Sequence, residues 1–242
     1  MSGFETIIYE KEEGIAYLTL NRPEVLNAVN IKMRDELYEV LPAIEDDPEI
    51  EVAIIKGAGE RAFSAGADIS EFGTAPSRVI ARQVRWERDL WGMFLSITKP
   101  LIAAIHGFAL GAGIEMAMCC DIRLASEDAR FGLPEVNLAM IPTAGGTQTM
   151  PRLLTLGRAT EIILTGEQID AKEALRIGLI SRVVPRPLLL PTAREIARKL
   201  MSYDRLALKY AKEAITKGLD MPLEQGLELE RRLFRRLLNR AP

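Results

Sequence analysis

Cysteine and histidine are scarce in this chain. Its 242 residues include two cysteines and one histidine. The cysteines, Cys119 and Cys120, are adjacent, and neighbouring residues are poorly placed to bridge each other or to chelate a metal. Free cysteines are usually buried, so we predict two core thiols. No Cys-x-x-Cys or His-x-x-x-His spacing occurs, so a zinc or iron site has few ligands, and we expect no metal cofactor.

The chain also lacks an excess of charge of one sign and a long uninterrupted apolar run. Its net charge is −3 with acids and bases interspersed, so no overall field would attract nucleic acid or an anionic membrane. The mostly apolar stretch from Pro100 to Met118 is interrupted by Glu115 and is not typical of a membrane span. The segment from Met1 to Gly14 is acidic and lacks the pattern of a basic-then-apolar leader. We therefore expect a cytoplasmic protein with no nucleic-acid or membrane partner.

Apolar residues, by contrast, make up 48% of the chain, which is enough to bury one sizeable core. The β-rich runs Ile7–Glu10 and Ile15–Leu20 predict an antiparallel hairpin. Asn30 can cap a helix whose buried face would carry Met33, Leu37, Leu41 and Ile44. Compact apolar strands are predicted at Val52–Ile55 and Pro100–Ile105. Because strands and helices alternate, the sequence indicates an α/β core.

The last third of the chain, from Gly145 onward, has mostly helical patterns. A strand-like segment at Leu179–Val184 stands among predicted helices at Ala171–Arg176, Pro191–Met201, Leu206–Lys217 and Leu223–Leu238. No linker rich in proline, glycine or serine marks a domain boundary. We expect a single α/β domain with a helical C-terminal extension.

The segment Ala62–Glu71 combines small residues with two acids, Asp68 and Glu71, at the three-residue spacing of a helix cap. A backbone amide left free at a helix entrance could donate to an oxyanion without reorganisation. Small side chains would let a ligand come close. An ordinary capped loop explains the same pattern, and this segment alone favours that interpretation.

A second run of small residues, Gly107–Glu115, again ends a strand and enters a helix. Its amides offer further donors, but its glycines do not form Gly-x-Gly-x-x-Gly and no Walker lysine follows, so nucleotide binding is disfavoured. Glu115 would lie in the first helical turn, where the helix dipole stabilises a carboxylate. Stabilisation of the helix start and catalysis both remain open for this residue.

Glu135 lies in a mostly apolar stretch, Phe131–Thr147. A carboxyl group desolvated in such surroundings has a raised pKa, which suits a group that must hold a proton near neutral pH. Pro134-Glu135 could equally begin an exposed helix. Composition alone does not bring Glu115 and Glu135 together.

Several other conspicuous side chains have structural interpretations. His106 has no partner in its motif, and we expect a packed or hydrogen-bonded histidine. Trp86 and Trp91 are expected to pack in the core rather than to stack on bases. The C-terminal arginines follow glutamates at helical distances, which favours a solvated helix face over a phosphate or nucleic-acid site for Arg231, Arg232, Arg235, Arg236 and Arg240.

Three motifs, taken in order, resemble the crotonase, or enoyl-CoA hydratase, superfamily: Ala65–Ile69, Gly107–Glu115, and Pro134-Glu135 through Gly145-Gly146-Thr147. The resemblance extends over nearly the whole chain. It implies a spiral of ββα units with an acyl-CoA site in residues 1–185, followed by a helical oligomerisation region at 186–242. It also implies assembly into a homotrimer or a dimer of trimers.

The resemblance further implies roles for individual residues. The backbone amides of Ala67 and Ala112 would form an oxyanion hole for the thioester carbonyl. The coenzyme A arm would be held by the neighbouring residues Ala65, Gly66, Asp68 and Ile69. Glu115 and Glu135 match the two acids of family hydratases, which position one water and move its proton to the substrate α-carbon.

Related isomerases commonly keep only the acid that matches Glu135, so the presence of both acids favours hydration of the 2,3-double bond of an enoyl-CoA thioester. Coenzyme A would enter as part of the substrate, and no separate cofactor is expected. Isomerisation or another crotonase-type acyl-CoA reaction is the alternative. A non-catalytic RNA-binding member is less favoured, with the C-terminal arginines as its main support.

The sequence departs from the family pattern at three positions and at its end. Ala112, Ala139 and Thr143 stand where glycine is common. If the backbone at Ala112 requires a positive φ, alanine costs roughly 1 kcal/mol relative to glycine. The C-terminal region looks shortened, which leaves pocket closure and subunit contacts open.

Overall fold

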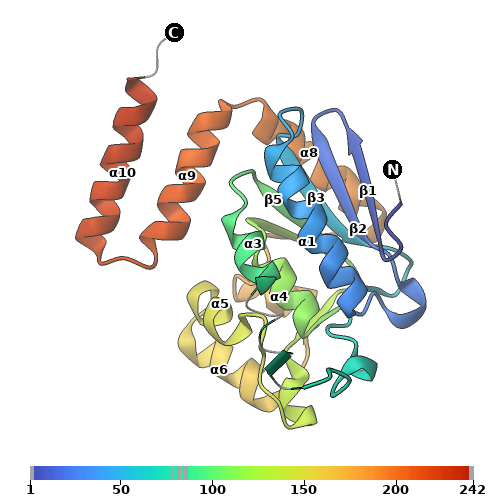
Figure 1. Cartoon of the computed structure of the whole chain (residues 1–242). Coiled ribbons are helices and arrows are strands. Elements are labelled where there is room, and N and C mark those ends of the chain that lie inside the picture. The colour runs from blue at the N-terminus through green and yellow to red at the C-terminus, as the bar shows by residue number, and fades with distance from the viewer. Residues whose placement is uncertain (1–2, 78, 81–82, 84–86, 240–242) are drawn as a thin grey trace.

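The strands of the computed structural model, which describes residues 3–77, 79–80, 83 and 87–239, form two sheets (Figure 1). The larger sheet has the order β1-β2-β3-β5-β7-β10 and the smaller β4-β6-β8-β9. The strands of the larger sheet are β1 (Ile7–Glu12), β2 (Ile15–Leu20), β3 (Val52–Gly57), β5 (Leu101–Ile105), β7 (Ile122–Ser126) and β10 (Arg182–Val184). Those of the smaller sheet are β4 (Ala62–Ser64), β6 (Phe108–Leu110), β8 (Arg130–Gly132) and β9 (Ile169–Asp170).

The N-terminal hairpin is confirmed, because β1 and β2 pair antiparallel with Ile7 opposite Leu20. The remaining pairs of the larger sheet are parallel. Both faces of the central strands β2, β3 and β5 are buried, which explains why these three are nearly continuous apolar runs rather than alternating ones, whereas the edge strand β1 is mostly exposed.

Helices cover the two faces of the larger sheet (Figure 1). On one face lie α1 (Ile31–Asp46) and α3 (Leu90–Ser96), and on the other lies α8 (Leu189–Met201). The Asn30 side chain accepts a hydrogen bond from the Met33 amide at 2.8 Å and so caps α1 as predicted. The expected apolar face of α1 is buried, including Met33, Leu37, Leu41 and Ile44.

The smaller sheet continues three strands of the larger one, because β4, β6 and β8 follow β3, β5 and β7 directly along the chain. The sequence predicted only a glycine turn between Gly107 and the next helix, and the strand β6 at Phe108–Leu110 was missed. Gly107 has φ +54, and a Cβ there would lie 2.0 Å from the Arg61 carbonyl oxygen. The chain thus turns from one sheet into the other where a side chain has no room.

The helices of the second half pack around this frame: α4 (Ala112–Met118), α5 (Gly146–Leu153), α6 (Leu156–Thr165) and α7 (Ala171–Arg176). Short 3-10 helices connect elements at η1 (Pro23–Val25), η2 (Ile69–Glu71), η3 (Pro134–Leu138) and η4 (Arg186–Leu188). Within the described residues, no helix has both the length and the apolar character needed to cross a membrane.

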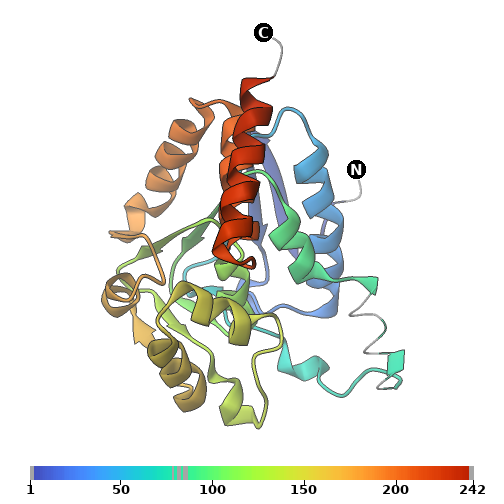
Figure 2. The same ribbon diagram turned by 90° about the vertical axis from the view of Figure 1, so that its left-hand side faces the viewer.

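The last two helices, α9 (Arg205–Gly218) and α10 (Leu223–Leu238), form a hairpin that projects to one side of the sheets in Figure 1 and lies in front of them in the view of Figure 2. By contrast, α8 buries Leu189, Ala193 and Ala197 against the larger sheet. The C-terminal region predicted at 186–242 therefore divides in the structure: α8 packs with the core, and the projecting hairpin is joined to the core from α9, where Arg205 donates to the Pro48 carbonyl and Lys212 to Asp121. The division of the chain at residue 185 stays a prediction.

Candidate active site

The segment after β4 carries the first predicted oxyanion donor, Ala67. The Val29 amide donates to the Gly66 carbonyl at 2.8 Å, and the Asp68 amide donates to the Val29 carbonyl at 3.0 Å. This parallel bridge uses the polar groups on either side of Ala67 and turns the amide of Ala67 itself away from Val29. Among the described residues no acceptor bonds that amide, and Ala67 is exposed, so the N–H is free to bind a ligand.

The second predicted donor, Ala112, is the first residue of α4. Gly111 precedes it with φ 51 and ψ −128, a conformation open to glycine, and anchors the turn by donating to the Gly132 carbonyl at 3.0 Å. The first amides of a helix have no intrahelical acceptor, and the Ala112 amide finds none elsewhere in the described chain.

Close contact between two glycines brings these two segments together. A Cβ at Gly66 would lie 3.4 Å from the Ala112 nitrogen and 3.5 Å from the Gly111 Cα. Side chains at either glycine would separate the segments. The structure therefore places the free amides of Ala67 and Ala112 at adjoining turns, as an oxyanion site requires.

Glu115 lies one helical turn into α4 and is only 2% exposed. Its Oε1 accepts hydrogen bonds from the amides of Ala144 at 3.0 Å and Gly146 at 2.7 Å, whereas Oε2 accepts none from the described residues. These donors come from a distant loop, so stabilisation by the start of its own helix does not account for Glu115. Desolvation by burial raises its pKa to about 7, assisted by the nearby charge of Glu135 and opposed by the two amides.

Glu135 lies in η3 and is half-buried. A Cβ at Gly111 would lie 3.0 Å from Glu135 Oε1, which places this carboxyl group at the entrance of α4. Its Oε2 is buried and has no hydrogen-bond partner among the described residues. Desolvation by burial raises the pKa of Glu135 as well. Pro134-Glu135 does begin a short helix, η3, but Glu135 itself is half-buried and not fully exposed.

Two carboxyl groups whose pKa values are raised by burial, placed beside two free amides, can move protons next to a stabilised oxyanion. The sequence predicted each part, but only the fold brings Glu115, Glu135, Ala67 and Ala112 together. The burial of both acids in one place is typical of a catalytic site.

The four residues expected to hold coenzyme A have different surroundings. The Ala65 amide donates to the Leu26 carbonyl at 2.9 Å, while its own carbonyl accepts no bond from the described residues. Gly66 is buried, and Ile69 is 62% exposed and open to a ligand. The Asp68 carboxylate is engaged by the protein itself, because Ser70 and Arg22 donate to it and lower its pKa.

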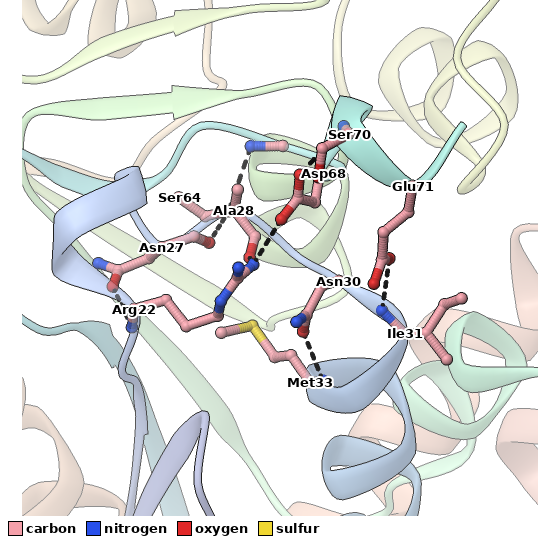
Figure 3. A network of polar contacts seen from close by, with 11 residues as sticks. Arg22, Asn27, Ala28, Asn30, Ile31, Met33, Ser64, Asp68, Ser70 and Glu71 are labelled. Atoms are coloured by element: carbon pink, nitrogen blue, oxygen red, sulfur yellow. Dashed lines mark hydrogen bonds and ion pairs between the residues drawn. The ribbon is translucent and has the colours of Figure 1, made fainter. Parts of the chain in front are cut away.

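Sequence reasoning missed the polar network around Asp68 (Figure 3). Arg22 forms an ion pair with Asp68 at 2.8 Å. The segment that contains Arg22 is joined to β4 by two hydrogen bonds: Asn27 donates to the Ala62 carbonyl, and the Ser64 hydroxyl donates to the Asn27 carbonyl. Arg22 stands between Asn21 and Pro23, a setting that does not by itself indicate a functional role. No local pattern marks a contact between residues 46 positions apart.

The three departures from the family pattern fall in different environments. Ala112 has no positive φ, so the penalty considered for it does not arise; the positive φ belongs to Gly111. Ala139, at the end of η3, does adopt a left-handed conformation with φ 55. Thr143 is exposed.

His106, the two cysteines, the tryptophans and the C-terminal arginines are the other side chains that were interpreted from the sequence. His106 is buried, which lowers its pKa, and its Nε2 has no partner in the described structure. Cys119 and Cys120 are buried free thiols, as predicted. Trp91 stacks on Phe94 with ring centroids 6.3 Å apart, and Trp86 lies outside the described residues, as does Arg240. The other C-terminal arginines are exposed on α10, where Arg231 pairs with Glu228.

Comparison with known proteins agrees with this geometry. The family model for enoyl-CoA hydratase/isomerase matches residues 10–241. A short-chain-enoyl-CoA hydratase of Clostridium acetobutylicum is 44% identical, covering 94% of this chain and 87% of the relative, and a crotonyl-CoA hydratase of Syntrophomonas wolfei is 41% identical, covering 96% and 89%.

The crystal structure of an enoyl-CoA hydratase from Bacillus anthracis superposes with a TM-score of 0.93 at 39% identity, covering 98% of this chain and 92% of that one. An enoyl-CoA hydratase structure from Geobacillus kaustophilus gives 0.92 at 37% identity, covering 99% and 92%. The expected crotonase-like fold is thereby confirmed. By sequence and by structure, the chain belongs to the enoyl-CoA hydratase/isomerase family.

Proposed function

We propose that this protein adds water to the 2,3-double bond of an enoyl-CoA thioester to give a 3-hydroxyacyl-CoA, and catalyses the reverse dehydration. The observation that carries this proposal is the placement of two carboxyl groups with raised pKa, Glu115 and Glu135, beside the free amides of Ala67 and Ala112. The relatives named as hydratases of crotonyl-CoA and of short-chain enoyl-CoA favour a short acyl chain.

In the proposed reaction the thioester carbonyl oxygen lies between the amides of Ala67 and Ala112. Their hydrogen bonds stabilise the negative charge that develops on this oxygen and make the β-carbon electrophilic. Because the donors are backbone amides held in tight turns, they need little reorganisation as the charge appears. Coenzyme A is held through its contacts along the Ala65–Ile69 segment, with the Ala65 carbonyl as an available acceptor.

Water positioned by Glu115 and Glu135 attacks the β-carbon. Glu115 acts mainly as the base that orients this water and takes its proton, and Glu135 as the acid that protonates the α-carbon. The two groups interact electrostatically, so their protonation steps belong to the pair rather than to either residue. These groups supply both proton transfers, and the proposal needs no cofactor beyond the coenzyme A of the substrate.

Product analysis tests the reaction type. The enzyme is incubated with linear, branched and cyclic enoyl-CoA thioesters, and the products are weighed by mass spectrometry. Hydration adds the mass of one water, whereas isomerisation leaves the mass unchanged. Gain of one water with a short linear enoyl-CoA supports the proposal, and an unchanged mass with every substrate contradicts it.

Substitution of the two acids tests their roles. Glu115→Gln and Glu135→Gln should each lower turnover by about 10²–10⁴-fold, because glutamine keeps the shape but cannot exchange the proton. Binding of a saturated acyl-CoA, measured by calorimetry, should survive because the amides hold the thioester. The two losses should not add, since both side chains serve one water. Normal turnover in Glu115→Gln alone would instead indicate a one-acid isomerase.

We also propose assembly into a homotrimer or a dimer of trimers in the cytoplasm. Support comes from the projecting hairpin, whose large apolar side chains are solvent-exposed in the single chain: Ile215, Leu219, Leu223, Leu227, Phe234 and Leu238. Exposed apolar surface of this kind is typical of subunit contacts. Light scattering tests the assembly, and a fully active monomer at micromolar concentration would contradict it.

A further inference from the structure

We propose that Arg22 is a positioning residue for the reaction, holding the Ala67 amide in its donating orientation through Asp68. This inference rests on the proposed function, in which that amide binds the thioester oxygen. It gives a role to a polar network outside the acid pair, and it moves the Asp68 side chain from coenzyme A binding to the support of the oxyanion site.

One guanidinium nitrogen joins both sides of the bridge that carries Ala67 (Figure 3). Arg22 Nη1 donates to the Ala28 carbonyl at 2.7 Å and to Asp68 Oδ2 at 2.8 Å. Ala28 immediately precedes Val29, and Asp68 immediately follows Ala67, so these two acceptors flank the Val29–Ala67 bridge. Arg22 therefore fixes the two backbone segments relative to each other where the free amide emerges.

Arg22 is itself held on a rigid base. Its amide donates to Asn27 Oδ1 at 2.9 Å, and the Asn27 amide donates back to the Arg22 carbonyl at 2.8 Å. Asn27 is fully buried, and its Nδ2 donates to the carbonyls of Ala58 at 2.9 Å and Ala62 at 2.8 Å. The main chain of Arg22 is thus anchored, through Asn27, to β4, the strand that leads into the Ala67 loop.

The residues on both sides of Ala67 are fixed by side chains as well. Asp68 Oδ1 accepts from the Ser70 amide at 3.1 Å and from its hydroxyl at 2.6 Å. On the other side, the Gly66 amide donates to Ser64 Oγ at 3.2 Å. The Gly66 amide, the Gly66 carbonyl and the Asp68 amide are therefore all bonded within the protein, whereas the Ala67 amide has no acceptor among the described residues and is left as a donor for a ligand.

A positioning role and a merely structural role differ in how strongly the loss of the ion pair should affect turnover compared with stability. The side chains of Arg22 and Asp68 are 18% and 14% exposed, so breaking this partly buried pair should cost some stability. A misplacement of about 1 Å at a reacting group, however, can cost about 10²-fold in rate. Breaking the pair should therefore affect turnover and carbonyl polarisation more than folding.

The test uses butyryl-CoA labelled with ¹³C at the thioester carbonyl, whose stretching frequency is followed by difference infrared spectroscopy. Two hydrogen bonds from the oxyanion site should lower this frequency on binding to the wild-type protein. In Arg22→Met and Asp68→Asn the downshift should largely disappear, and kcat for crotonyl-CoA should fall about 10- to 100-fold with KM changed less than about threefold. Arg22→Lys should recover part of both effects.

Asp121→Asn is the matched control. Asp121 also accepts from one cation, Lys212 at 2.7 Å, and from one backbone amide, that of Leu101 at 2.7 Å, and it precedes β7 at the opposite end of the larger sheet. Its replacement should leave the carbonyl frequency and kcat unchanged. The double variant Arg22→Met/Asp68→Asn should be no slower than Arg22→Met alone, because both changes break one contact.

The outcomes distinguish the two proposals. No downshift in the wild-type protein overturns the oxyanion site itself. A wild-type downshift that persists in folded Arg22→Met and Asp68→Asn, with kcat unchanged, overturns the positioning role and leaves the proposed function intact. If Arg22→Met does not fold by circular dichroism, Asp68→Asn decides alone, because asparagine keeps the oxygen that accepts from Ser70.

Discussion

Glu115 occupies a site that disfavours its own charge. Burial raises its pKa from an ordinary 4.5 to about 7, so the folded state keeps a proton that the unfolded state releases between these values. Stability from this residue is therefore fully present below about pH 4.5 and is lost as the pH rises through about 7. Replacing this acid should relieve the cost at alkaline pH.

Glu115→Gln is accordingly expected to be more stable than the wild type at pH 8, by up to about 3 kcal/mol, with the difference shrinking toward pH 5. Glutamine keeps an oxygen for the Ala144 and Gly146 amides. Urea denaturation at the two pH values measures the effect. Glu36→Gln is the control with opposite sign, since hydrogen bonds from Thr6 and Glu5 outweigh burial and lower the pKa of Glu36. A Glu115→Gln protein less stable at pH 8 than at pH 5 relative to wild type would contradict this account.

Ala139 and Ala112, two alanines that stand where the family commonly has glycine, differ in backbone conformation. Ala139 adopts φ 55, where alanine is strained and glycine is not, so Ala139→Gly should raise the free energy of unfolding by up to about 1 kcal/mol. Ala112 begins α4 without a positive φ, so Ala112→Gly should give no such gain. Thermal denaturation of both variants provides the measurement, and an equal response would show that φ is not the cause.

At the scale of elements, the contact between α4 and β4 decides where the donors and Glu115 lie. A Cβ at Gly113 would come within 2.3 Å of the Ser64 carbonyl oxygen, so Gly113→Ala should push α4 away from β4. We expect a loss of about 1–3 kcal/mol in stability together with a loss of turnover. Gly157→Ala, in α6 and facing open space, is the matched control and should be neutral or stabilising by up to about 1 kcal/mol. Equal effects in the two variants would argue against the packing explanation.

The elements also show how far the sequence could be interpreted. The cap at Asn30, the buried face of α1 and the range of α10 were predictable because each depends on residues within a few turns. The strand β6 was not, since it has three residues and lies between glycines whose conformation is set by contact with β4 and β8. Local sequence patterns do not predict a short strand whose conformation depends on contacts with residues distant in the sequence.

The same reasoning applies to the site. The resemblance to a family identified Glu115 and Glu135, but composition left both open to structural interpretations. What decides between these is the burial of Glu115 under the Ala144–Gly146 loop, a contact across about 30 residues. No sequence pattern indicates a functional role for Arg22, because an arginine beside a proline in a turn is common.

At the scale of the whole molecule, the projecting hairpin presents an apolar stripe along α10. Leu223 and Leu238 lie at its two ends and are 79% and 66% exposed. Leu223→Asp and Leu238→Lys place charges where they favour the helix dipole, so the helix itself should not be weakened. The double variant is expected to dissociate the proposed assembly while the core stays folded, as measured by light scattering and circular dichroism.

Gln225→Asp is the control for this variant, because it adds an acid to the same first turn of α10 outside the stripe. It should leave the assembly unchanged. If the stripe variant keeps the mass of the wild type in solution, the stripe is not the subunit contact.

The two proposed oxyanion donors belong to the main chain, and this has a consequence for any mutational survey. Systematic replacement by alanine would pass over both positions unnoticed, since Ala67 and Ala112 are alanines already. The donors of the proposed oxyanion site would thus not be detected by an alanine scan. Proline at position 112 would remove the donor while suiting the first position of a helix. If many side chains are accepted at these two positions, selection there acts on the conformation of the backbone rather than on the identity of the side chain.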